Sequence, residues 1–161
     1  MPSDRDQRLL DRARALGLDP DAPLLVGGNY QPLLLHAGIA HVSGQVPRIG
    51  QQVVVTGSAE TVGLEEARRA ACIGALRALA LLRQQLGSLG AVAQLLRVGV
   101  YVQAGPGFSQ HSEVADAASE LLVAVLGPAG RHARTSVGVA SLPKNATVEL
   151  ELQAALLSAA G

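Results

Sequence analysis

Aromatic side chains and an excess of charge of one sign are what this 161-residue sequence has least of. It contains no Trp, and its aromatic residues are Tyr30, Tyr101 and Phe108. Thirteen Lys and Arg residues balance thirteen Asp and Glu residues, so the formal net charge is +0 at pH 7. Proteins that bind nucleic acid use basic side chains for the phosphates and aromatic rings for stacking on bases. We therefore expect no nucleic-acid partner.

Cysteine, long apolar runs and metal-ligand spacing are also scarce. Cys72 has no second cysteine to pair with, which excludes an internal disulfide and favours a packed core thiol. No segment reaches the ~18–20 apolar residues that span a membrane, and the charged residues 3–6 are unlike a signal peptide. The histidines have neither zinc-like spacing nor cysteine partners. We therefore expect a cytoplasmic protein without a membrane contact, a metal site or another cofactor.

Hydrophobic periodicity predicts both helices and strands. Ser3 and Asp6 have the spacing of a helix N-cap pair, and Gly17 ends the helical pattern that follows. Two long helices are expected, from about residue 62 to 86 and from 112 to about 126. The expected strands are residues 33–36, 39–43, 53–56, 95–103, 132–139 and 147–155.

This order of elements predicts one domain of the α+β class. Most neighbouring strands are joined by short turns, and two helices cross over between strands. We expect a mixed β-sheet with the two long helices packed on one face. The domain is expected to span residues 1–161, with residues 1–20 as an N-terminal helical extension.

The strands expected at 132–139 and 147–155 show the clearest alternation, and the turn between them predicts that they pair as a ribbon. Arg134 and Ser136 share one face of the first strand, and Glu149 lies opposite the apolar face of the second. We expect the apolar faces under the helices and these polar side chains on the other face. Pattern alone favours a solvated surface. The functional interpretation is a polar cleft in which Arg134 binds a carboxylate and a glutamate orients or deprotonates a water.

Three blocks of residues also stand in a characteristic order. They are Gly28-Asn29-Tyr30, then Val42-Ser43-Gly44-Gln45-Val46-Pro47, and last Ala133-Arg134-Thr135-Ser136-Val137 with Leu142-Pro143-Lys144 and Val148-Glu149-Leu150-Glu151. In this order they resemble the G-P-Y element, the S-G-Q-[IVL]-P strand and the C-terminal signature of the RidA/YjgF family. Members of this family are reactive-intermediate deaminases, and some are labelled endoribonuclease L-PSP-like. The resemblance runs from about residue 27 to 155, and the spacing is similar to that of a longer branch of the family.

The resemblance implies a chorismate-mutase-like α+β fold and a homotrimer with clefts between subunits. Better-known members hydrolyse 2-imino acids such as 2-iminobutanoate and 2-iminopropanoate to 2-keto acids and ammonia, without a metal or an organic cofactor. By this resemblance Arg134 holds the substrate carboxylate, and Glu149 helps to position or activate the attacking water. Tyr30 and Ser43 line the pocket.

Three positions of the proposed pocket depart from the family pattern. Ser136 stands where many members have Cys, Asn29 replaces a Pro, and Asp116 takes a position where the family often has Asn. Ser136 and Asp116 are nevertheless expected to contact the substrate, and the charge of Asp116 leaves the substrate open because it repels a carboxylate. The hypotheses are therefore an imine/enamine deaminase, a non-catalytic trimer that binds a small carboxylate, and an RNA-cleaving protein, against which the neutral charge and few aromatics speak.

Overall fold

The structure, a computed structural model, describes residues 2–158 of the chain. The helices are α1 (Asp4–Ala15), α2 (Ala59–Val62), α3 (Leu64–Leu86) and α4 (His111–Leu126). The strands are β1 (Leu33–His36), β2 (Ile39–Gln45), β3 (Arg48–Ile49), β4 (Gln52–Val53), β5 (Val92–Gln103), β6 (Ala133–Val139) and β7 (Val148–Leu156). Short 3-10 helices lie at Leu89–Ala91, Gly127–Gly130 and Pro143–Asn145.

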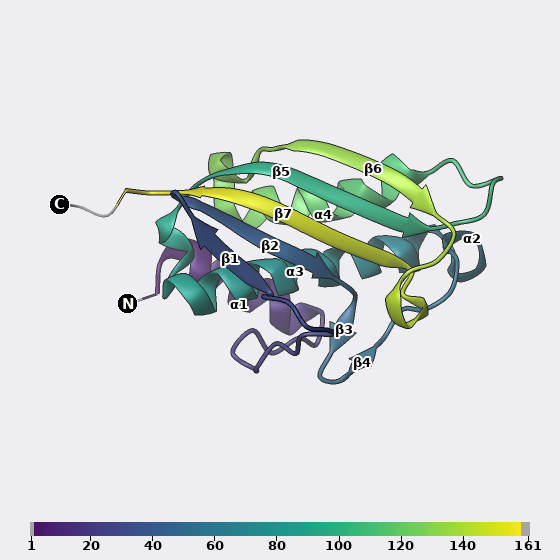
Figure 1. Ribbon diagram of the computed structural model, residues 1–161, viewed down its shortest axis with the longest axis horizontal. Helices are drawn as coiled ribbons and strands as arrows, with labels where there is room; N and C mark the ends of the chain where they lie inside the picture. Colours follow the sequence, from purple (N-terminus) through teal and green to yellow (C-terminus); the bar gives the residue numbers. More distant parts are fainter. Residues whose placement is uncertain (1, 159–161) are drawn as a thin grey trace.

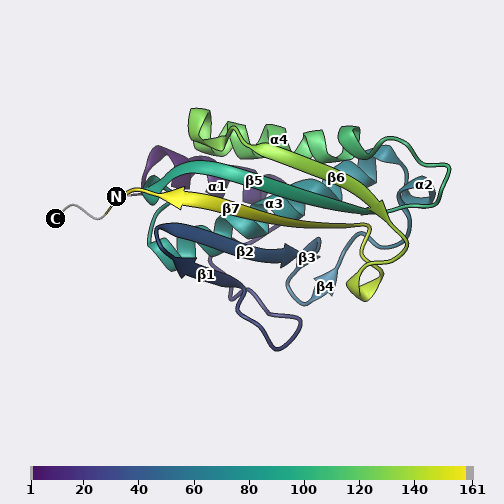
Figure 2. The same cartoon turned by 45° about the horizontal axis from the view of Figure 1, so that its top comes forward.

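Five strands form one mixed sheet in the order β1-β2-β7-β5-β6, and β3 and β4 form a separate small ribbon (Figure 1). Strands β5 and β6 run parallel, whereas the other neighbours in the large sheet are antiparallel. Figure 2 shows α3 and α4 on one face of this sheet, with α1 on the same side. The predicted α+β class, with two long helices on one face of a mixed sheet, is therefore confirmed.

Small residues let α3 lie close to the sheet. A Cβ at Gly74 would stand 3.2 Å from the carbonyl oxygen of Gln45 and 3.5 Å from the Cβ of Leu150. Every residue of α3 from 75 to 82 is buried, so this helix forms the centre of the core. Burying such aliphatic side chains supplies the main free energy of folding. Within residues 2–158, no helix has the length and apolar character needed to cross a membrane.

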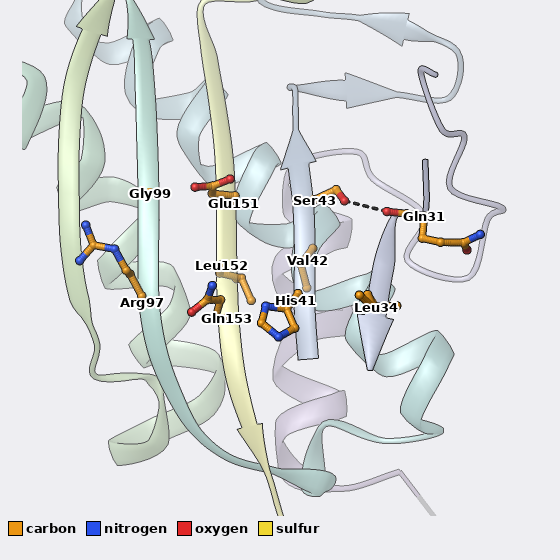
Figure 3. A pocket seen from close by; sticks show the side chains of 10 residues that line it. All are labelled: Gln31, Leu34, His41, Val42, Ser43, Arg97, Gly99, Glu151, Leu152 and Gln153. Carbon is orange, nitrogen blue, oxygen red and sulfur yellow. Dashed lines mark hydrogen bonds between the residues drawn. The ribbon is translucent and has the colours of Figure 1, made fainter. Parts of the chain in front are cut away.

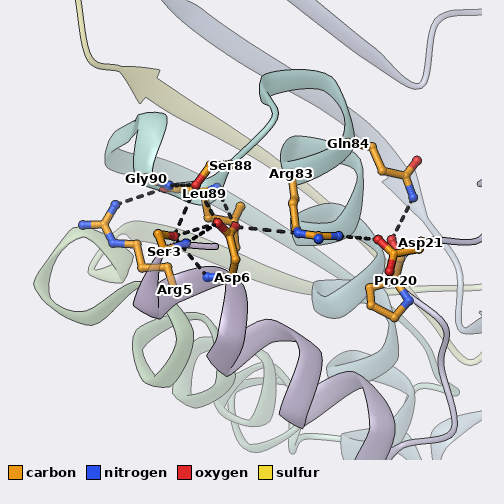
Figure 4. Close-up of polar contacts among 10 residues, drawn as sticks. All are labelled: Ser3, Arg5, Asp6, Pro20, Asp21, Arg83, Gln84, Ser88, Leu89 and Gly90. Carbon is orange, nitrogen blue, oxygen red and sulfur yellow. Dashed lines mark hydrogen bonds and ion pairs between the residues drawn. The ribbon is translucent and has the colours of Figure 1, made fainter. Parts of the chain in front are cut away.

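The buried carboxylate of Asp6 attaches α1 to the rest of the domain (Figure 4). Asp6 is 1% exposed and accepts hydrogen bonds from the Ser3 backbone at 2.9 Å, the Ser88 hydroxyl at 2.6 Å and the Leu89 backbone at 2.8 Å. Burial acts to raise the pKa of Asp6, but the bonds from Leu89, Ser88 and Ser3 outweigh it and lower the pKa below its ordinary value. The predicted N-cap pair is present, and it also serves as a tertiary contact.

Several predicted boundaries are close, and one strand is wrong. Gly87 ends α3 with a φ of 82°, the left-handed conformation that glycine tolerates. The second long helix begins one residue earlier than predicted and has Gln110 as its N-cap. The strand predicted at 53–56 does not form. Only Val53 of this range belongs to a strand, the short β4, and Thr56 makes an isolated bridge to Ala146.

The predicted C-terminal ribbon is also wrong. Strands β6 and β7 are consecutive in sequence, but β5 lies between them and pairs with both. β5 has 12 residues, against 7 in β6 and 9 in β7. β5 is long enough to pair with all of β6 on one side and with most of β7 on the other. The order of the strands therefore follows from a pairing between residues far apart in the chain.

Candidate functional site

Five of the predicted site residues fall into two separate groups, and Ser43 lies apart from both. Arg134, Asp116 and Ser136 lie on β6 and α4, at one edge of the sheet. Tyr30 and Glu149 line a cavity near the end of β2. The two groups are described in turn.

Arg134 points toward the helices, which corrects the face predicted for it. In the register of the sheet Arg134 pairs with Val98, and Val98 pairs with Leu152. Val98 and Leu152 are 0% and 2% exposed and lie under the helices. Side chains paired across a sheet share a face, so Arg134 shares theirs, and Ser136 follows because it lies two residues further on. Glu149 alternates with buried residues of β7 and lies on the opposite face, so the expectation that Arg134 and Glu149 share a face is wrong.

Arg134 takes part in a chain of hydrogen bonds between β6 and α4. Its Nη1 donates to Oδ1 of Asp116 at 2.9 Å and to Oγ of Ser119 at 3.0 Å. Ser119 Oγ lies 2.9 Å from Nε2 of His132, whose Nδ1 lies 2.6 Å from the Gly130 carbonyl oxygen. Because a carbonyl only accepts, Nδ1 carries a proton, and Nε2 of a neutral imidazole then accepts from Ser119. One edge of the guanidinium is thus already occupied by groups of the same chain.

Asp116 lies beside Arg134, the proposed carboxylate receptor, as its ion-pair partner. The side chains of Arg134 and Asp116 are 20% and 51% exposed, so both remain in contact with solvent.

Glu149 lies in a cavity of about 170 Å³ with Tyr30. A Cβ at Gly44 would lie 2.8 Å from Cδ of Glu149 and still nearer to its Oε1, so only glycine at position 44 leaves room for this carboxylate. Burial, and then the nearby charge of Glu151, raise the pKa of Glu149 above its ordinary value. A carboxylate with a raised pKa is a stronger proton acceptor, as a general base requires.

A β-bulge creates this arrangement. Val42 pairs with Leu152 and Gln45 pairs with Leu150, so β2 uses one residue more than β7 between these pairs. Bulges bend a strand and redirect its side chains. Here the bulge includes the Ser43-Gly44 segment of the S-G-Q motif, and it brings the Gly44 backbone against Glu149.

Ser43 lines a different and larger hollow on the open face of the sheet (Figure 3). This hollow has a volume of about 510 Å³ and includes Arg97 and Glu151. The Ser43 hydroxyl donates to the carbonyl oxygen of Gln31 at 2.7 Å, which ties β2 to the segment that leads from Tyr30. Ser43 thus supports the Tyr30 segment but does not line the cavity of Glu149.

The turn before β7 completes the cavity. Lys144, which lines it, and the adjacent Asn145 both have a φ of 57°, a left-handed conformation that is uncommon for residues other than glycine. The Gln103 side chain donates to Oδ1 of Asn145 at 3.0 Å and to the Ala146 carbonyl at 3.2 Å. These bonds hold the L-P-K-N turn of the signature beside Glu149.

Two further cations line the cavity, and the sequence analysis missed both. Helical periodicity assigns a charged residue such as Arg77 to the exposed side of α3, yet Arg77 is 4% exposed. Its Nε donates to Oε1 of Gln45 at 3.2 Å, and its Nη1 donates to the Arg48 carbonyl oxygen at 3.1 Å. Burial, followed by the charge of Arg48, lowers the pKa of Arg77 to about 10. A signal was available, because Arg77 is the one charged residue in the run from 70 to 82.

Metal-ligand chemistry finds no support in the part of the chain described. Among residues 2–158, no three His, Cys, Asp or Glu side chains gather in a way that would hold a metal ion. The groups available for chemistry are instead a half-buried carboxylate, a phenol and several guanidinium groups.

Several known proteins are similar to this chain in sequence and fold. Protein TCP17 of Trypanosoma cruzi is 34% identical over 146 residues, which cover 89% of this chain and 91% of TCP17. The crystal structure of Atu1372 of Agrobacterium tumefaciens, a protein of unknown function, is 32% identical, covers 94% of each chain and has a TM-score of 0.82. TdcF of E. coli, crystallised with bound serine, shares the fold at 18% identity and a TM-score of 0.62, over 87% of this chain and 96% of its own. Residues 11–156 match the YjgF/chorismate mutase-like family, which also carries an endoribonuclease label. The chain belongs to this family.

Proposed function

We propose that the protein is a cofactor-free hydrolase of small 2-imino acids, which it converts to 2-keto acids and ammonia. The observation that carries the proposal is Glu149, a half-buried carboxylate of raised pKa that lines a small cavity with Tyr30. Family membership supports it, because imine deaminases and endoribonuclease-labelled proteins both belong to this family. A neutral net charge and three aromatic residues favour the small substrate over RNA.

The proposed chemistry needs only orientation and a base. The imine carbon is electrophilic, so water adds to it when a carboxylate accepts the proton of that water. Glu149 is the proposed acceptor, and Tyr30 lines the same cavity. The tetrahedral adduct, formed from the protonated imine, then expels ammonia: the proton held by Glu149 passes to the nitrogen, the C–N bond breaks, and the hydroxyl group of the adduct loses its proton to the Glu149 carboxylate as the C=O bond forms. No oxidant or reductant is required.

Arg134 is the proposed receptor for the substrate carboxylate, but it cannot act beside Glu149 of its own chain. The two side chains leave opposite faces of the sheet. We therefore propose that a second copy supplies one of them, in a homotrimer with its sites between subunits. The open face of the sheet supports association, because Leu34 and Val137 lie exposed on it at 55% and 40%.

A second candidate function is binding of a small carboxylate without turnover. Asp116 and Ser136 favour it, because both depart from the family pattern next to Arg134 while the guanidinium that would bind a carboxylate is kept. Under this alternative a carboxylate binds in an Arg134-dependent way, and 2-imino acids disappear at the rate of the reaction without protein.

The test is the release of 2-keto acid and ammonia from 2-iminopropanoate, corrected for the spontaneous reaction. We expect catalysis by the wild type and loss of most activity in Arg134→Ala and Glu149→Gln. Removal of a charge-assisted contact costs about 2–5 kcal/mol of transition-state binding. Arg69→Ala is the matched control, because Arg69 pairs with Glu66 on the exposed side of α3. Equal rates for wild type and Arg134→Ala would refute the role of Arg134.

Light scattering tests the assembly separately. A mass of three chains at micromolar concentration is expected. A single-chain mass would remove the proposed shared site, even if hydrolysis is observed. Cleavage of RNA that persists through purification and is lost in Arg134→Ala would instead favour the RNA-cleaving hypothesis.

A further inference from the structure

The cavity of Tyr30 and Glu149 contains positive charge without a matching anion. Arg48, Arg77 and Lys144 line it, and Glu149 is the acidic residue in its wall. The formal charge of the lining is therefore positive, although the net charge of the whole chain is +0.

Arg77 is a buried cation held only by neutral acceptors. At 4% exposure, its guanidinium bonds to the amide oxygen of Gln45 and to the backbone carbonyl of Arg48. Among residues 2–158, neither Arg77 nor Arg48 forms an ion pair. A buried charge without a counter-charge carries a large desolvation penalty, which an anion in the cavity would offset.

Arg48 points to the same conclusion by an independent observation. Its Nε is the one buried side-chain nitrogen or oxygen between residues 2 and 158 that has no hydrogen-bond partner. Buried donors without acceptors are rare in folded proteins and call for an explanation. The two guanidinium groups are near enough for the charge of Arg48 to lower the pKa of Arg77, so one anion could serve both.

The shape of the cavity limits what the anion is. A volume of about 170 Å³ lies below the range of about 300–1,000 Å³ that holds drug-sized ligands. Its other walls include Leu24, Val26 and Leu81, which suit a short aliphatic group. The planar fork of a guanidinium matches a carboxylate with two parallel hydrogen bonds.

We infer that Arg48 and Arg77 form an anion site for the carboxylate of a small aliphatic acid, in the same cavity as Glu149. This deepens the proposed function and rests on it in one respect, namely that the cavity is where the reaction occurs. A substrate that is held by Arg134 through one carboxylate and by Arg48 and Arg77 through another is a dicarboxylic 2-imino acid. Binding at Arg48 and Arg77 does not itself require turnover.

The experiment is ligand-observed NMR on the full chain with butyrate, a short monocarboxylate. Butyramide is the neutral control of equal size, and inorganic phosphate tests whether any oxyanion suffices. We expect butyrate to bind, butyramide not to bind and phosphate to bind more weakly. Arg77→Gln and Arg48→Gln are expected to weaken butyrate binding about tenfold or more, since each removes a charge-assisted contact.

Controls separate this site from the others. Arg97→Gln, which alters the hollow on the open face, is expected to leave butyrate binding unchanged. Arg77→Lys keeps the charge without the fork and is expected to retain part of the affinity. Circular dichroism monitors folding, and if Arg77→Gln fails to fold, the half-buried Arg48 carries the test.

Four outcomes would overturn the inference that Arg48 and Arg77 bind a carboxylate. These outcomes are no butyrate binding, equal binding of butyramide, binding of phosphate alone, and butyrate binding that is lost in Arg134→Ala but kept in Arg77→Gln and Arg48→Gln. The last of these would leave Arg134 as the receptor and so would support the proposed function. Conversely, butyrate binding that depends on Arg77, in a protein that hydrolyses no imine, would refute the deaminase and leave the anion site standing.

Discussion

Gly44 and Glu149 approach each other so closely that Gly44→Ala should move the proposed catalytic carboxylate and little else. The three atoms nearest to a Cβ at position 44 all belong to the Glu149 side chain, and Cδ would lie at 2.8 Å. Restoring an ordinary contact displaces the carboxylate by about 1 Å, a misplacement that can cost about 100-fold in rate. Forcing the side chain off its preferred rotamer costs only about 0.5–1.5 kcal/mol of stability.

The assay therefore compares two quantities in one variant. We expect kcat for 2-iminopropanoate to fall about 100-fold, while the free energy of unfolding in urea changes by no more than about 1.5 kcal/mol. Gly107→Ala is the control, because nothing lies within 4 Å of a Cβ there. Unchanged kcat in a folded Gly44→Ala protein would show that the position of Glu149 does not matter for catalysis. A loss of stability well above that limit would show that the strand, and not the Glu149 side chain, absorbs the overlap.

Three further predictions concern stability and substrate affinity. Asp6→Asn should destabilise the protein by about 2–4 kcal/mol at neutral pH, since it breaks a buried charge-assisted network. Folding lowers the pKa of Asp6 below 3.8, so the stability that its carboxylate contributes is fully present above that value and is lost as the pH falls through the folded pKa. The free energies of unfolding of wild type and Asp6→Asn, measured in urea, should therefore converge in acid. A constant difference between the two free energies down to low pH would contradict this. Gly130→Ala should cost at least about 1–3 kcal/mol, because its Cβ would lie 2.5 Å from the Leu122 carbonyl oxygen, a backbone atom that cannot swing away; a melting temperature equal to that of Gly107→Ala would contradict it. Asp116→Asn should lower KM for an anionic substrate severalfold at a similar kcat, with a stability change of at most about 1 kcal/mol for so exposed a pair; a raised KM would mean that Asp116 itself holds the substrate.

Signals that depend on neighbouring residues predicted the elements well. The cap at Ser3 and the helix end at Gly17 each follow from the conformational preference of one residue type, and each is present. The two long helices follow from spacing along a single segment. These features were predictable because their free energy is determined within a few residues of the chain.

The neighbours of each strand could not be predicted in this way. The turn before β7 resembles a hairpin loop, but β5 occupies the place between β6 and β7. The apolar residues of β6 then misled the assignment of faces: Val137 was expected under the helices, yet it lies on the open face and is 40% exposed. In this edge strand Val137 and Val139 lie on the open face while Arg134 and Ser136 lie toward the helices, so alternation alone does not reveal the buried face.

Arg77 shows a different limit. Helical periodicity assigns a charged residue to solvent by default, because a charge is costly to bury. Here Gln45, which belongs to the S-G-Q motif, turns toward the helices and accepts from Arg77. The S-G-Q motif resembles that of a known family, but only the contact between β2 and α3 reveals that the amide of Gln45 accepts a hydrogen bond from Arg77.

The opposite orientations of Arg134 and Glu149 constrain any mechanism that uses both. Sheet register alone separates them, and a side-chain rotation cannot carry either group through the plane of hydrogen-bonded strands. If both contact one small substrate, they must come from two chains. The two-residue mechanism thus requires an assembly of at least two chains, which the proposed trimer provides. A catalytically active single chain would mean that the substrate carboxylate is bound by cations that line the Glu149 cavity, and Arg48 and Arg77 are already in place there.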